Sequence, residues 1–164
     1  MPGYKSHLTA GGVAAVVVLA HTHWALPTGS LVTPENLWYI GACLFGSLFP
    51  DIDIKSKGQR LWYYALAPCI ALATWFGSIS LLGALGVLSV IPPLLPHRGI
   101  THESWFVVCA PLAVPFVLWL YHPAHLILGF NLYGYFVLGA FTHLILDFGV
   151  MKFIKRGLYR KNRK

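Results

Sequence analysis

The chain has 164 residues, of which 57% are hydrophobic, 15% are aromatic and only 10% are charged, and its formal net charge is +7 at pH 7. Soluble domains carry about a quarter charged residues, so this composition, with a mean hydropathy of +0.65, excludes an ordinary soluble domain and indicates a membrane protein. Because a membrane-spanning helix needs about 20 apolar residues, the length admits about five or six spans and no sizeable soluble domain.

Apolar runs separated by short polar links predict an all-α, polytopic membrane bundle of about six short spans. The runs cover residues 8–26, 37–49, 61–96, 104–121 and 126–148. The uncharged run 61–96 is too long for one straight span, because a helix of that length would measure about 54 Å. The sequence "WFGSIS" near its middle offers a turn. We therefore expect two short spans there, or a re-entrant hairpin.

The basic residues predict the orientation of the chain. With six crossings, all 12 Lys and Arg residues fall on one side of the membrane. The positive-inside rule makes that side cytoplasmic, so we expect a multi-pass protein of the inner (plasma) membrane with both termini in the cytoplasm. Residues 1–150 should form a single transmembrane domain. The basic tail, 151–164, should lie against anionic lipid headgroups. Because this bias accounts for the positive charge, no specific nucleic-acid partner is expected.

Ligand-type side chains gather at the predicted cytoplasmic ends of four separate segments. They are His7, Asp51, Asp53, His97, His102, Glu103, His143 and Asp147, with Arg98 among them. A charged group in a bilayer costs at least about 3 kcal/mol, so such residues usually pair, face a cavity or bind a ligand. Imidazoles and carboxylates without a thiolate suit zinc, manganese or iron, but not a structural zinc site. We expect one or two divalent ions, zinc or manganese.

Each segment has a simpler explanation when it is taken alone. His7 could be an interfacial residue, and Asp51 and Asp53 could cap a helix or pair with nearby cations. The segment "HRGITH" could be a tight polar loop in which Thr101 caps the next helix, and Asp147 could pair with Lys152. A single metal centre explains all four segments at once, and we favour it for that reason. The i, i+4 spacing of His143 and Asp147 supports it, because both side chains then project from one helix face. The remaining histidines are expected at the outer interface: His21, His23, His122 and His125.

The reaction that best suits these residues is hydrolysis of a phosphoester or pyrophosphate bond. Two ions about 4 Å apart can clamp a phosphoryl group and activate water. Arg98 is expected to bind the phosphate oxygens of the substrate, and Glu103 is a candidate general base or partner of a metal ligand. The position at the cytoplasmic leaflet suggests membrane lipids as partners and a lipid or lipid-linked phosphate as substrate.

Two other classes of function remain open. The first is a non-catalytic membrane metal-binding, sensor or transport module, although few polar residues in the middle of the spans argue against a conduction path. The second is a scaffold that recruits a soluble regulator through the basic tail. The sequence makes no prediction of the oligomeric state.

The order of the motifs resembles a known family. His7, "LFPDID", "HRGITH" and "HLILD" on a small multi-span chain are similar to the YdjM-like family of membrane-bound proteins predicted to be metal-dependent hydrolases, also described as LexA-binding and inner-membrane-associated. The resemblance covers roughly residues 7–147. Members of the family often have serine where this chain has Glu103. The resemblance implies a metal centre formed by His7, Asp51, Asp53, His97, His102, His143 and Asp147.

Overall fold

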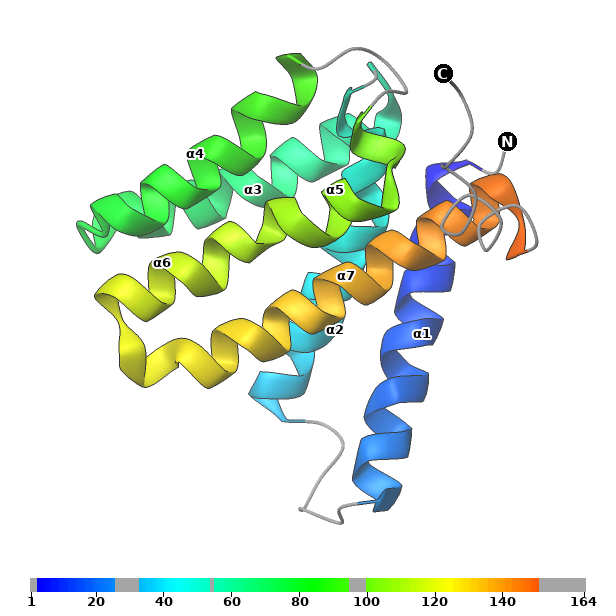
Figure 1. Ribbon diagram of the computed structural model, residues 1–164, viewed down its shortest axis with the longest axis horizontal. Coiled ribbons are helices and arrows are strands. Elements are labelled where there is room, and N and C mark those ends of the chain that lie inside the picture. The colour runs from blue at the N-terminus through cyan, green and yellow to red at the C-terminus, as the bar shows by residue number, and fades with distance from the viewer. Residues whose placement is uncertain (1–2, 26–32, 54, 95–99, 151–164) are drawn as a thin grey trace, which may run out of the picture.

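The computed structural model describes residues 3–25, 33–53, 55–94 and 100–150, and this part of the chain is helical, with no strand (Figure 1). The predicted all-α class is confirmed. Four short 3-10 turns separate or extend the helices: η1 Phe49–Asp53, η2 Ile100–His102, η3 Ala110–Leu112 and η4 Pro123–His125. The α-helices are α1 Tyr4–Ala25, α2 Pro34–Leu48, α3 Lys57–Trp75, α4 Ile79–Leu94, α5 Ser104–Cys109, α6 Ala113–Tyr121 and α7 Leu126–Phe148.

Local sequence explains where several helices begin and end. The Thr33 hydroxyl accepts a hydrogen bond from the Asn36 amide (3.2 Å), and Pro34 occupies the first turn, where its missing amide hydrogen is not needed. Ser56 caps α3 in the same way. The chain reverses between α3 and α4 within the predicted "WFGSIS" segment, and Gly77 adopts a φ of 65° there, a backbone conformation that favours glycine.

The expectation of six spans is not supported. In the described residues, three helical segments are long and apolar enough to cross a membrane: Tyr4–Ala25, Ser104–Tyr121 and Pro123–Phe148. The second of these contains α5, η3 and α6. By contrast, α2 has 15 residues and α4 has 16, so each is about 22–24 Å long, shorter than a hydrocarbon core of about 30 Å. The apolar runs predicted the helices correctly, but the helices formed by the run 37–49 and by the second half of the run 61–96 are too short for a span.

Helices α1, α2 and α7 pack against one another, and the contact between α2 and α7 is the most extensive. The two backbones approach closely at Gly46 and Gly139: a Cβ atom at Gly46 would overlap the carbonyl of Phe136, and one at Gly139 would overlap the carbonyl of Cys43. Helices α3 and α4 form a hairpin, and α6 packs against both α4 and α7. The close crossing of α2 and α7 fixes how the predicted cytoplasmic ends of these two helices lie relative to each other.

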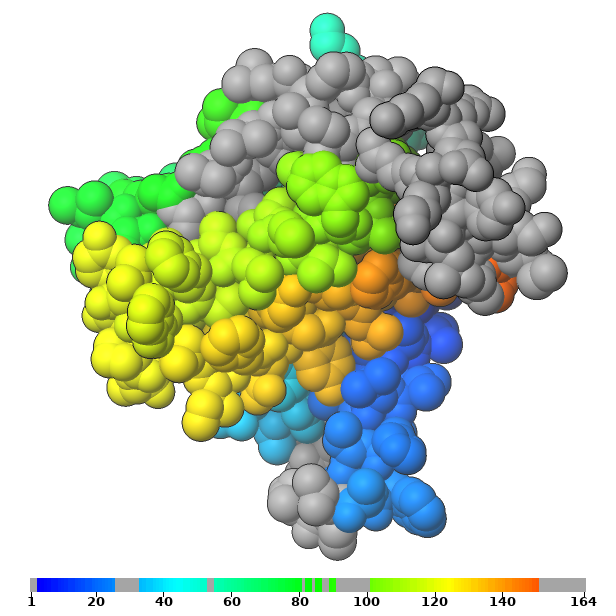
Figure 2. Space-filling view, in the orientation of Figure 1, coloured from blue at the N-terminus to red at the C-terminus, as the bar shows by residue number. Residues whose placement is uncertain are grey.

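Apolar side chains cover the outer surface of the candidate spans, as expected where helices face lipid. Examples are Val16 in α1, Phe116 and Trp119 in α6, and Ile127 in α7. In the space-filling view, α7 lies between α6 and α1 on the face shown (Figure 2).

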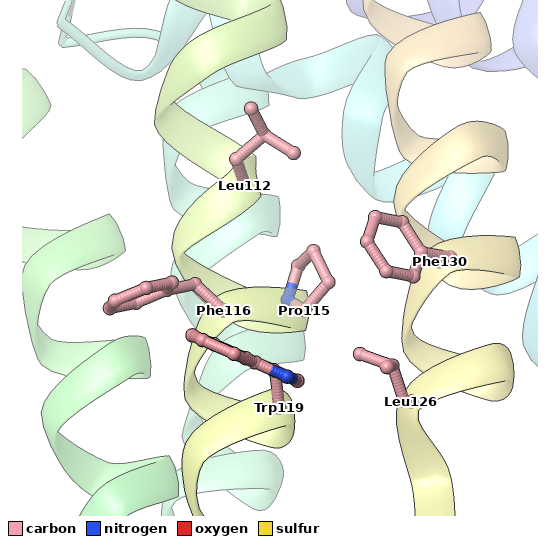
Figure 3. Close-up of a pocket in the computed structure, with 6 residues that line it drawn as sticks. All are labelled: Leu112, Pro115, Phe116, Trp119, Leu126 and Phe130. Atoms are coloured by element: carbon pink, nitrogen blue, oxygen red, sulfur yellow. The ribbon is translucent and has the colours of Figure 1, made fainter. Parts of the chain in front are cut away.

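An apolar groove of about 420 Å³ lies on the surface between α6 and α7 near the η4 turn. Its lining side chains are drawn in Figure 3. The lining residues are Leu112, Pro115, Phe116, Trp119, Leu126 and Phe130. Phe130 is 17 residues before Asp147, which places the groove about 26 Å along α7 from that residue. The groove therefore lies near the opposite end of α7 from the predicted metal ligands.

Candidate metal centre

Four of the predicted ligands meet at one point, although they come from three separate elements. Asp51 is on η1, His102 is on η2, and His143 and Asp147 are near the end of α7. Each side chain offers one ligand atom, and these four atoms all lie within 4.8 Å of one another. The cluster is mostly buried: the exposed fractions of the side chains are 0% for His143, 6% for Asp147, 8% for His102 and 21% for Asp51. Asp51 thus marks the open side of the cluster.

His143 is oriented by helix α2. Its Nδ1 atom lies 2.7 Å from the carbonyl oxygen of Ser47, and because a carbonyl only accepts hydrogen bonds, Nδ1 must be the donor. In the neutral ring, Nε2 then carries a lone pair, as in many metal-ligating histidines. Nε2 lies 3.4 Å from Asp147 Oδ2 and 3.6 Å from Asp51 Oδ1. The lone pair therefore faces two carboxylates.

His102 faces the same two carboxylates from the other side. Its Nε2 atom lies 3.7 Å from Asp51 Oδ1 and 3.8 Å from Asp147 Oδ2. Its Nδ1 atom lies 3.2 Å from the hydroxyl of Thr101, which is fully buried. A hydroxyl at this position can accept the Nδ1 hydrogen and so leave Nε2 available as a ligand.

The spacing of these atoms fits a metal ion. In a tetrahedral zinc site, bonds of about 2.0–2.1 Å place neighbouring ligand atoms about 3.4 Å apart. The four nitrogen–oxygen distances in the cluster are 3.4–3.8 Å, close to that separation, and no two of the four ligand atoms are more than 4.8 Å apart. Among the described residues, His143 Nε2 is buried without a hydrogen-bond partner, and a cation would satisfy it.

Ion pairing without a metal accounts for the cluster less well. His7 stacks on His143 with ring centroids 3.7 Å apart and an interplanar angle of 14°, and its Nε2 lies 3.5 Å from Asp147 Oδ1. If every histidine–carboxylate contact were an ion pair, both stacked rings would be positively charged. Two like charges about 4 Å apart repel by about 4 kcal/mol at an effective dielectric constant of 20. A cation between neutral rings and carboxylates avoids this repulsion.

Comparison with known proteins agrees with the motif resemblance. The family model described as YdjM inner membrane protein matches residues 1–152. The chain belongs to this family. No curated protein and no solved structure matches it. The matched range contains His7 and all four residues of the cluster. This YdjM-family chain therefore combines apolar helices long enough to cross a membrane with a candidate metal site. The orientation of its termini stays a prediction.

The other predicted site residues have different outcomes. His7 lies beside the cluster, as expected of a ligand or its neighbour. Asp53 ends η1, but its side chain is outside the described part of the structure, and so are His97 and Arg98. Glu103 is the N-cap residue of α5, directly after His102, and its proposed catalytic role stays a prediction.

Two groups that orient the ligands were not predicted from the sequence of this YdjM-family chain. They are the Ser47 carbonyl and the Thr101 hydroxyl. A backbone carbonyl has no sequence signal, whereas the position of Thr101 directly before His102 predicted only a helix cap. The outer histidines form no further group of ligands in the described residues, and His21, His122 and His125 are exposed.

Thr101→Val should weaken metal binding by about 10–100-fold, the usual effect of removing a hydrogen-bond partner of a ligating histidine. Valine keeps the shape of threonine but cannot accept the Nδ1 hydrogen of His102. Competition with a chromogenic chelator measures the affinity. Thr101→Ser restores the hydroxyl and should recover most of the affinity. Equal affinity in the valine variant and the parent would show that Thr101 does not orient His102.

Proposed function

We propose that the protein is a membrane-embedded, metal-dependent hydrolase that cleaves a phosphoester or pyrophosphate bond at the cytoplasmic leaflet. The observation that carries this proposal is the convergence of two imidazole nitrogens and two carboxylate oxygens within 4.8 Å. Asp51, His102, His143 and Asp147 would hold a divalent ion, with zinc or manganese suited to this mixture of ligands. Such an ion would polarise a phosphoryl oxygen and lower the pKa of bound water toward neutrality.

The location of the cluster supports a lipid or lipid-linked substrate. Asp147 is the penultimate residue of α7, and α7 lies in a candidate span. An ion near the end of a span lies at the depth of lipid headgroups, where phosphates are found. The phosphate would approach past Asp51, because its side chain is more exposed than those of the other three residues.

The residues of this chain would then have separate tasks. The four cluster residues would hold the ion. The Ser47 carbonyl keeps His143 in the ligating tautomer, and the Thr101 hydroxyl would accept the Nδ1 hydrogen of His102. We propose that Arg98 binds phosphate oxygens through its planar guanidinium group, and that Glu103 accepts a proton from the attacking water.

When zinc or manganese is added, purified full-length protein should release inorganic phosphate from a polyprenyl pyrophosphate, or a headgroup alcohol or its phosphate ester from phospholipid vesicles. The activity should disappear with a chelator and return when the metal is restored, because the ion activates the water. Phosphate release and product mass spectrometry measure this reaction. Protein that holds metal but turns over neither substrate would contradict the proposal and favour a non-catalytic metal-binding module, for which metal uptake into liposomes is the discriminating measurement.

A further inference from the structure

The two oxygen atoms of Asp147 face different histidines. Oδ2 lies 3.4 Å from Nε2 of His143 and 3.8 Å from Nε2 of His102. Oδ1 lies 3.5 Å from Nε2 of His7, on helix α1. His7 is buried, with 1% of its surface exposed, so it is held in this position by the packing of α1 against α7. The carboxylate therefore lies between the Nε2 atom of His7 on one side and those of His102 and His143 on the other.

The stacking of His7 on His143 sets the distance between these two positions. The rings are nearly parallel, with centroids 3.7 Å apart, and both direct Nε2 toward the same carboxylate. Ions bound in the planes of two such rings would be separated by about the ring spacing. Two-metal hydrolytic sites hold their ions about 3.5–4 Å apart, which matches this spacing.

We propose that Asp147 bridges two divalent ions. The first is the ion of the proposed function, bound by Asp51, His102, His143 and Asp147 Oδ2. The second is bound by His7 Nε2 and Asp147 Oδ1, and oxygen atoms of the substrate phosphate complete its coordination. The proposal rests on the proposed function, because it takes the phosphate as the substrate group.

Within the described residues, the two positions have different numbers of candidate protein ligands, and we expect them to bind their ions with different affinities. Four protein ligands converge on the first position, but the described residues supply two for the second. Mg²⁺ is usually bound through one or two carboxylates together with substrate phosphates, and we expect the same of this second divalent ion. The second ion should therefore bind weakly to the protein alone and more tightly when phosphate is present.

Manganese binding to the purified full-length protein in lipid nanodiscs tests this inference. Elemental analysis should find one Mn²⁺ per chain without phosphate and two with inorganic phosphate. Electron paramagnetic resonance should then show the signal of a spin-coupled pair, because ions bridged by one carboxylate interact magnetically. His7→Gln should hold one ion under both conditions and show no coupled signal.

His21→Gln is the matched control, since His21 is exposed on the same helix and should leave two ions in place. Circular dichroism checks that both variants keep their helices. Wild-type protein that stays at one ion with saturating manganese and phosphate would overturn the inference without any variant, and so would a second ion retained by His7→Gln. Two coupled ions without turnover would overturn the proposed hydrolase function alone. Turnover with a single ion would overturn only the proposal that Asp147 bridges two ions.

Discussion

Asp51→Ala and His102→Ala should each lose the bound metal on purification. Each substitution removes one of four ligands that lie within 4.8 Å of one another. Loss of a hydrogen-bond partner behind a ligand costs about 10–100-fold in metal affinity, so loss of the ligand itself should cost more than about 100-fold. Elemental analysis after dialysis, followed by titration with zinc and manganese, measures the effect.

Two variants serve as controls for this loss. Glu35→Ala removes an exposed acid from the first turn of α2, and His125→Ala removes an exposed histidine near the start of α7. Neither residue belongs to the cluster, so both variants should keep the metal content of the parent. Parent-like metal content in Asp51→Ala and His102→Ala would mean that the four side chains are an ion-pair network and not a metal centre.

The helices were predictable because apolar runs this long have no other stable structure in a membrane. The number of spans was not, because an apolar run can form a helix that is too short to cross a membrane. In the second run, the α-helix gives way to a 3-10 turn at Phe49–Asp53, where Pro50 has no amide hydrogen for an α-helical hydrogen bond. This turn ends α2 and also places Asp51 in the cluster, so the feature that limits the length of this helix also helps to form the site.

The cluster of candidate ligands was predictable because histidine and carboxylate side chains suited to one ion occur in four segments at similar predicted depth. The i, i+4 spacing of His143 and Asp147 also fixed their relative position without any tertiary information. The tautomer of His143 was not predictable from the sequence. The group that accepts its Nδ1 hydrogen is the backbone carbonyl of Ser47, and every residue has such a carbonyl. The crossing of α2 and α7 places this particular carbonyl beside His143.

Gly139→Ala should therefore damage both the fold and the site. A Cβ atom there would overlap the carbonyl of Cys43 and lie 2.8 Å from the backbone nitrogen of Ser47. These are backbone atoms of α2, so relief requires the whole helix to shift. Overpacking of this kind costs about 1–3 kcal/mol, and we expect the upper end, about 3 kcal/mol. Thermal unfolding in detergent, followed by circular dichroism, measures the destabilisation.

Gly134→Ala on the same helix is the control, since a Cβ atom added there would meet no neighbouring side chain or helix within 4 Å. Alanine is the better helix former by about 1 kcal/mol, so this variant should be at least as stable as the parent. An ion that binds only the folded protein raises its stability, so added zinc should raise the melting temperature of the parent and of Gly134→Ala. It should do so much less for Gly139→Ala, because the displaced Ser47 carbonyl no longer orients His143. Normal metal binding by a destabilised Gly139→Ala protein would separate the helix crossing from the metal centre and contradict this link.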